Sequence, residues 1–299
     1  MLPEKKFKSI EQNEVDFLLT KNYSTLMVAF YELQSSWMSR IYKRYNNIET
    51  ANIICSFARN THLEIIRQKE YNLNHDVSLS NFWVNFYNIS KPVVKITYLA
   101  HETAIPKETV RRKVKNLSDS EFVVYDAKKR GYRWDILPQN KNSSSDKDFY
   151  LKFISAEISI ISKFIFNFSE FFNLNLSIKS IEDEFRSQYS FYWYHFLSCQ
   201  LQWLKMWQKK FKDNEMILIA LQTAIPTLQY VHKIENHKNQ SLDLDNVFNL
   251  IGKTSHQYDS SLKGVSAASV SQVTGIPRAT CVRKLEKLAL LGFLLQETK

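Results

Sequence analysis

The sequence predicts a mainly α-helical protein with small β-hairpin wings, built as two similar halves in tandem, and three observations support this fold class. The 299 residues include only five glycines and six prolines, which favours long helices over a turn-rich sheet structure. Side chains repeat at helical spacing, as Phe30, Gln34 and Trp37 do at i, i+4 and i+7. One motif also occurs twice, at residues 103–123 and again at residues 274–294.

The two copies of the motif align when Ile105 is matched with Ile276. Upstream, an aromatic-rich segment that begins at Tyr23 matches another that begins at Tyr189. Because both matches occur in the same order and at nearly the same offset along the chain, we interpret the protein as an internal duplication. Identical pairs include Thr103/Thr274, Ile105/Ile276, Pro106/Pro277, Thr109/Thr280, Arg112/Arg283, Lys113/Lys284, Leu117/Leu288, Phe122/Phe293, Trp37/Trp203 and Glu49/Glu215.

A polar, serine-rich stretch at residues 139–148 (QNKNSSSDKD) separates the halves, and its lack of periodicity predicts a flexible linker. Each half is then a helical segment followed by one copy of the motif. The expected boundaries are 1–138 for the first half (helical segment 10–90, motif region 91–138) and 149–299 for the second (helical segment 149–235, motif region 258–299).

The first copy predicts a short helix, a tight turn and a second helix. We expect residues 94–103 to form the short helix, with Leu99 and Ala100 directed inward. A turn follows at Ala104, and Pro106 suits the first turn of a new helix, where its missing N–H costs nothing. The second helix carries an apolar stripe, expected to be buried, with basic residues on its other sides. The stripe consists of Val110, Val114 and Leu117.

Two β-rich runs follow the second helix, FVVYDA at residues 122–127 and GYRWDI at residues 131–136. The basic residues KKR lie between them, which predicts a hairpin with a basic tip. The second copy has Gly275 at its turn and reaches Lys299 without a comparable basic tip. The first copy has Ala104 in place of the turn glycine, a change that is tolerated if the backbone stays outside the left-handed region.

Helix, turn, basic helix and basic hairpin is the order of elements in a winged helix-turn-helix. The shared string T-(A/G)-I-P-x-x-T-(V/C)-x-R-K-(V/L)-x-x-L, followed by (E/G)-F-(V/L), resembles the winged-helix bacterial transcription regulators, a broad group that includes the multiple-antibiotic-resistance (MarR-like) type. The resemblance covers the two motif regions and leaves the helical segments outside. It implies a sequence-specific transcriptional regulator whose partner is double-stranded DNA, and the net charge of +10 agrees with a polyanionic partner.

The basic residues of the two motifs are the candidate DNA contacts, in three groups. Those that open the second helix of each unit can reach base edges in the major groove, where arginine pairs with guanine. They are Lys107, Thr109, Arg111 and Arg112 in the first unit and Arg278, Thr280 and Arg283 in the second. The expected phosphate contacts are Lys113, Lys115, Lys284 and Lys287. The expected contacts of the first wing are Lys128, Lys129, Arg130 and Arg133.

Two units in one chain predict a monomer that acts as a single-chain pseudo-dimer. The helical segments would pack together in place of a dimer interface and set the recognition helices about 34 Å apart, one turn of DNA. The units differ at Arg111/Val282 and Glu108/Ala279, so we expect them to read different bases. Plasmid-type replication initiators, which also carry two winged-helix units, and winged-helix protein–protein scaffolds are the alternative classes.

Other classes find little support in the sequence, so we expect no enzyme and no cofactor or metal. His232 and His237 lack a neighbouring cysteine, and no glycine-rich phosphate loop occurs. Three scattered cysteines indicate a reducing compartment, and the N-terminus has no apolar signal core. Charged or polar residues interrupt both long apolar stretches, which argues against membrane spans. We therefore expect a cytoplasmic protein, associated with the nucleoid when bound.

The aromatic-rich stretches at residues 149–172 and 189–207 have two interpretations. They could line a pocket for an unidentified small-molecule effector, as regulators of this class often do. Aromatic residues at helical spacing more often form core, and we favour that interpretation because they would also pack one half against the other.

Overall fold

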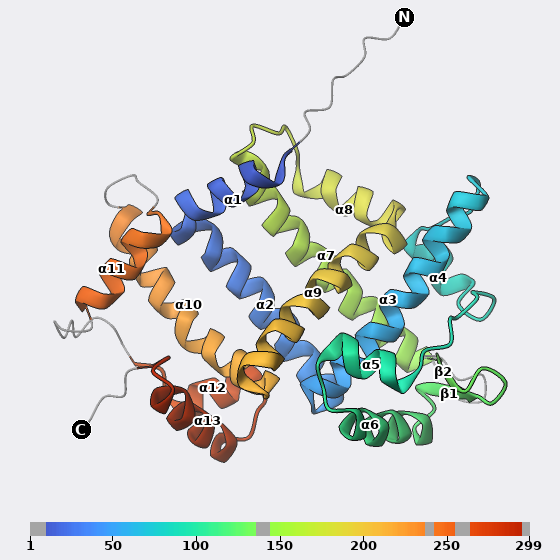
Figure 1. The fold of residues 1–299 in the computed structure, drawn as a ribbon. Coiled ribbons are helices and arrows are strands. Elements are labelled where there is room, and N and C mark those ends of the chain that lie inside the picture. The colour runs from blue at the N-terminus through green and yellow to red at the C-terminus, as the bar shows by residue number, and fades with distance from the viewer. Residues whose placement is uncertain (1–9, 136–143, 237–241, 255–263, 295–299) are drawn as a thin grey trace, which may run out of the picture.

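A computed structural model describes residues 10–135, 144–236, 242–254 and 264–294 of the chain (Figure 1). Over these residues the protein is mainly helical and has one two-stranded sheet, which confirms the predicted class. The elements are α1 (Gln12–Lys21), α2 (Tyr23–Tyr45), α3 (Ile48–Tyr71), α4 (Leu79–Val84), α5 (Ile96–Thr103), α6 (Lys107–Asp119), β1 (Val123–Asp126), β2 (Gly131–Trp134), α7 (Ser144–Glu170), α8 (Ile178–Ser187), α9 (Tyr189–Phe211), α10 (Asn214–Asn236), α11 (Leu244–Thr254), α12 (Ala267–Thr274) and α13 (Arg278–Leu290).

The order of helices repeats along the chain, with α1 to α6 followed by α8 to α13. Local geometry repeats with it, in the same register that matches Tyr23 with Tyr189. Glu11 and Ser177 both close capping boxes, at the starts of α1 and α8. Asn22 and Gln188, which end those helices, have φ/ψ values of −111°/37° and −110°/38°. Among the described residues, α7 is the helix without a counterpart.

The helical segments of the two halves interlock. Helix α2 packs against α10, and α3 packs against α9, so each long helix pairs with one from the other half (Figure 1). The ring of Trp37 on α2 lies edge-on to that of Phe196 on α9, with centroids 6.1 Å apart. One cluster of buried apolar side chains runs from Leu33 to Leu288 and includes residues of both motif copies. The apolar faces of one half are therefore buried largely by the other.

Two predicted boundaries differ from the structure. Helix α5 begins at Ile96 instead of residue 94, because Val94 forms an antiparallel bridge with Tyr132 of β2. The Val94 N–H donates to the Tyr132 carbonyl at 2.8 Å, and the reverse bond is 2.9 Å. Helix α7 begins at Ser144, so residues 144–148 of the predicted linker are helical, while residues 139–143 lie outside the described residues.

The hairpin expected after α6 is present. Strands β1 and β2 are antiparallel, with Val123 opposite Trp134 and Asp126 opposite Gly131. Gly131 is required there, because a Cβ atom would lie 2.6 Å from Val93 Cγ1 and 2.8 Å from the Val94 carbonyl oxygen. The last strand of a second wing would fall on residues 295–299, outside the described residues.

The aromatic-rich stretches contribute heavily to the core. Tyr189 and Trp193 on α9 and Tyr150 on α7 are buried. They line, with Trp37 and Trp83, an almost wholly apolar cavity of ≈ 60 Å³. Pockets for drug-sized ligands are typically about 300–1,000 Å³, so burial favours the core interpretation and an effector remains a prediction. In the described part of the chain, no helix has the length and apolar character needed to cross a bilayer.

The turn between α5 and α6 does not meet the condition under which alanine is tolerated there. Ala104 has φ 56° and ψ 20°, inside the left-handed region, as Gly275 does in the second unit with φ 80°. Both residues end the first helix of their unit, a position that favours glycine because a Cβ atom strains this conformation. The fold imposes the conformation on Ala104 because Ile105 must enter the core, where it is 2% exposed.

Relief of this strain is testable by stability measurements. Ala104→Gly should raise the free energy of unfolding by about 1 kcal/mol, because glycine adopts the left-handed region without strain. Gly275→Ala should lower it by a similar amount, with the new Cβ about 3.3 Å from Lys43 Cγ. Urea denaturation of the three proteins measures both changes, and a destabilised Ala104→Gly would contradict this account of the turn.

A second stability prediction concerns His62, which is fully buried on α3. Its ring stacks on Phe82 at 4.7 Å and meets Tyr189 edge-on at 5.2 Å. Neither ring nitrogen has a hydrogen-bond partner among the described residues, and burial lowers the pKa of His62 from 6.5 to about 3. The folded state therefore holds a neutral imidazole at a pH where the unfolded chain binds a proton.

This contribution to stability is complete above pH 6.5 and is lost as the pH falls toward 3. The slope in that window is about 1.4 kcal/mol per pH unit, so wild type should lose about 2 kcal/mol by pH 5 through this group. His62→Leu places at this site the residue found at the matched position Leu228 and should remove that part of the loss. Denaturation at pH 7 and pH 5 tests this, and parallel losses in the two proteins would refute it.

Candidate nucleic-acid interface

The repeated Thr-x-Ile-Pro string builds the same turn in both units. In the first, the Thr103 hydroxyl donates to the Leu99 carbonyl at 2.7 Å and accepts from the Ile105 N–H at 3.3 Å. Thr274 makes the two equivalent bonds at 2.7 and 3.1 Å. Threonine therefore satisfies backbone groups at the end of the first helix while the following isoleucine enters the core. The second helix begins directly after proline, so each proline is the N-cap residue, one position before the first helical turn in which the sequence placed Pro106.

The second helices, α6 and α13, each bury one side. The predicted stripe of Val110, Val114 and Leu117 is buried on α6. On α13 the matched positions Cys281 and Leu288 are fully buried, and Leu285 is partly buried. Burial of this side leaves the opposite side of each helix at the surface. Both helices lie along the lower edge of the molecule in Figure 1, and the hairpin lies at the right.

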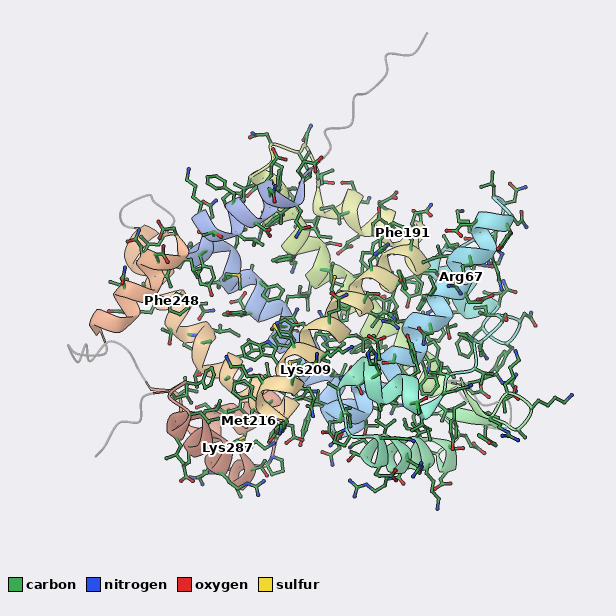
Figure 2. All side chains as sticks on the ribbon, viewed as in Figure 1. Arg67, Phe191, Lys209, Met216, Phe248 and Lys287 are labelled. Atoms are coloured by element: carbon green, nitrogen blue, oxygen red, sulfur yellow. The ribbon has the colours of Figure 1, made fainter. Side chains whose placement is uncertain are left out.

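Most of the predicted base-contact residues reach the surface. Thr109 and Thr280 are partly buried. Arg111 forms an ion pair with Glu108 on its own helix, whereas the matched Val282 and Ala279 cannot. The exposed candidates are Lys107, Arg111, Arg112 and Lys115 on α6 and Arg278, Arg283 and Lys287 on α13, where Figure 2 labels Lys287 at the lower edge.

Lys113 is not directed to the surface as the sequence analysis expects. Its Nζ atom is 2.7 Å from Asn47 Oδ1 and 3.3 Å from Glu49 Oε2, and its side chain is 13% exposed. Asn47 caps the N-terminus of α3, and Glu49 lies in the first turn of that helix. The ammonium group therefore ties α6 to the start of α3 instead of pointing away from the protein.

Lys284 corrects the same expectation in the second unit and is the more buried of the two. Its Nζ atom lies 2.7 Å from Asp213 Oδ2 and 2.7 Å from Glu215 Oε2, and its side chain is 9% exposed. Asp213 and Glu215 occupy the positions that Asn47 and Glu49 occupy in the first half. The sequence did carry a signal for these ion pairs. Lys113 and Glu49 both recur in the second half, as Lys284 and Glu215, which is expected if the lysine and the glutamate of each half bind one another.

The first wing presents its cations at an ordered tip. Lys128, Lys129 and Arg130 are exposed, and Arg130 adopts a left-handed φ of 51°. The Lys129 N–H donates to Asp126 Oδ1 at 2.9 Å, and this bond lowers the pKa of Asp126. Arg133 Nε lies 3.8 Å from Asp126 Oδ2, so its charge is partly compensated within the hairpin.

The wing is anchored to the helical core at its base. Trp134 of β2 is buried and meets the ring of Phe86 edge-on at 5.5 Å. Lys91 lies 4.0 Å above the same Phe86 ring and 3.8 Å from Asp135 Oδ1. These contacts hold the hairpin in a fixed position relative to α6.

Two further cations near the interface carry no motif signature and were missed in the sequence. Arg44, in the last turn of α2, lies 5.8 Å from the ring of Phe122. Lys210, the matched residue of α9, lies 4.9 Å from the ring of Phe293. In each unit the phenylalanine that follows the second helix therefore packs beside a cation from the helical segment. The duplicated Phe122/Phe293 pair was visible in the sequence, but its partners depend on the tertiary fold.

No family model, curated protein or solved structure matches this chain.

The inward role of Lys284 is testable by its effect on stability. Lys284→Met keeps the apolar stem but leaves Asp213 and Glu215, 28% and 19% exposed, without their cation. The free energy of unfolding should fall by about 2 kcal/mol, less than for a fully buried pair. Lys287→Met is the matched control on the exposed side of α13 and should change stability by no more than about 0.5 kcal/mol. Equal effects in urea denaturation would refute this assignment.

Proposed function

We propose that this protein is a sequence-specific transcriptional regulator that binds double-stranded DNA through two diverged winged-helix units of one chain. The observation that carries the proposal is the repeated arrangement of α6 and α13. Each helix follows a Thr-x-Ile-Pro turn and buries one side in the core. It presents arginine and lysine on the opposite side, which faces away from the core. That geometry suits a helix that enters the major groove.

The first unit has the larger set of surface cations for this role. Lys107, Arg112 and Lys115 extend from α6, and the tip of the wing adds Lys128, Lys129 and Arg130. Lys113 and Lys284 leave the proposed set of phosphate contacts, because both ammonium groups bind within the protein. The first unit is thus proposed to supply most of the non-specific electrostatic affinity.

A single-chain pseudo-dimer is proposed as the active form. Its basis is the reciprocal packing of α2 on α10 and of α3 on α9, which lets one chain supply what two subunits supply in a homodimer. Since the surfaces of α6 and α13 differ, the proposed target is an asymmetric pair of half-sites. The protein should bind as one chain per duplex.

A protein-binding role for the second unit is the alternative that a specific observation favours. Val282, Leu290 and Leu291 are exposed on or just after α13, by 39%, 88% and 52%. The matched residues of the first unit, Arg111, Asp119 and Ser120, are charged or polar. Apolar surface of this kind is more typical of a protein contact than of a DNA backbone contact.

Selection of bound duplexes from random sequences tests both roles. Wild type should enrich one site with two half-sites about 10 base pairs apart. Arg112→Ala and Arg283→Ala should each relax the sequence preference in a different half, by about 1–3 kcal/mol of discrimination at the affected base pair. If only Arg112→Ala has an effect, the second unit serves another partner. If wild type enriches no sequence, the proposal fails.

The wing provides the control for removal of charge without removal of base contacts. Replacing Lys128 and Lys129 with alanine should weaken binding to all duplexes alike. It should reduce the dependence of log affinity on log salt by about one for each phosphate that the wing no longer neutralises. A changed sequence preference in these variants would contradict the division of roles.

A further inference from the structure

A hollow of ≈ 560 Å³ lies beside the recognition helix of the first unit, between α6 and the junction of α2 with α3. Its walls come from three parts of the chain: the end of α2, the cap and first turn of α3, and α6 from its middle onward with the residues after it. The lining residues are Arg44, Tyr45, Asn47, Thr50, Arg112, Lys113, Asn116, Leu117, Ser120 and Phe122. None of these ten described residues carries a carboxylate.

Three cations from two helices, α2 and α6, border this hollow. Arg44 is positioned by aromatic rings, with its guanidinium 5.8 Å from the ring of Phe122 and 5.6 Å from that of Tyr150. Arg112 reaches the hollow from the exposed side of α6. Lys113 is part of the wall and is already compensated by Glu49. Arginine suits the oxygens of phosphate through paired donors, and its several N–H groups let it bind a ligand while it keeps contacts within the protein.

Neutral donors complete the lining. Asn47 Oδ1 accepts from the Thr50 N–H at 2.9 Å and from Lys113 Nζ at 2.7 Å, which leaves its amide nitrogen as the group able to donate outward. Asn116 and Ser120 add donors from the other wall. A concave surface with two arginines and several neutral donors fits an anion that has several acceptor oxygens.

The second unit does not keep these neutral donors. Asp213 replaces Asn47, Met216 replaces Thr50, and Leu291 replaces Ser120 at the matched positions. Asp213 binds Lys284 at 2.7 Å, so the cap position carries a negative charge in that unit. The set of donors beside α6 is therefore a property of the first unit and does not follow from the winged-helix fold alone.

We propose that the hollow between α6 and the α2–α3 junction binds a phosphate group. The phosphate comes either from the backbone of DNA lying along α6 or from a free phosphorylated ligand. The first source rests on the proposed function, and the second does not. In both cases Arg44 holds the phosphate oxygens and the Asn47 amide donates to them. Arg112 adds positive charge at the rim of the hollow and keeps its proposed base contact.

The second unit suggests the variant that tests this site. Asn47→Asp introduces the carboxylate that Asp213 supplies in the other half, keeps an oxygen to cap α3, and removes the outward donor. Asn74→Asp is the matched control, because it makes the same change of charge at an exposed residue beyond the far end of α3. Circular dichroism and thermal melting of both full-length variants establish that they are folded.

The first arm is calorimetric titration of the full-length proteins with inorganic pyrophosphate. The second arm measures affinity for a random-sequence duplex at several salt concentrations. Asn47→Asp should weaken pyrophosphate binding roughly 10- to 100-fold, the loss expected when a charged hydrogen-bond site is disrupted, and Asn74→Asp should match wild type. If DNA supplies the phosphate, Asn47→Asp also lowers the slope of log affinity against log salt by about one. If a free ligand supplies it, the slope stays at the value of Asn74→Asp.

The proposal is overturned if Asn47→Asp equals Asn74→Asp in both arms, or if wild type binds no pyrophosphate and the salt slopes agree. Failure of the proposed function has a different signature. Wild type would then bind no duplex, while the pyrophosphate titration would still separate Asn47→Asp from its control.

Discussion

The reciprocal packing of α2 on α10 and of α3 on α9 is the constraint on which the other features of this structure depend. Each of these helices has an apolar face whose exposure to water would be unfavourable, and the helix that buries this face comes from the other half of the chain. Trp37, Ile53 and Leu201 are almost completely buried in this shared core. Since the two halves bury each other, the two copies of the repeated motif are held on one closely packed support.

The two inward lysines connect that support to the proposed DNA-binding surface. Lys113 and Lys284 leave the second helix of each unit and bind the start of a long helix of the same half, α3 for the first and α10 for the second. Oxygen acceptors at a helix N-terminus stabilise the helix. The lysine ammonium group compensates the negative charge of the carboxylates among them. In both units, therefore, a lysine that the sequence suggests as a DNA contact instead holds the second helix, α6 or α13, against the helical segment.

The two units preserve what the turn requires and diverge where a partner would bind. Thr103 and Thr274 make the same two hydrogen bonds, and even Ala104 adopts the left-handed conformation that Gly275 provides without strain. Outside the turn, Arg111 has Val282 as its counterpart, and Asn47 has Asp213. The core tolerates little change because it is closely packed, whereas surface positions can change without loss of the fold.

The sequence by itself determined the helical class, the repeated order of helices, the two Thr-x-Ile-Pro turns and the first hairpin. Periodicity and the Thr-x-Ile-Pro turn are local signals, read within a few residues. The tertiary structure decided which basic residues point outward. Lys113 and Lys115 look alike in the sequence, but Glu49, on a helix distant in the chain, holds Lys113 inward. The tertiary structure also decided that Arg44 lies beside α6 and that Val94 pairs with the hairpin, because such contacts join segments that no local pattern relates.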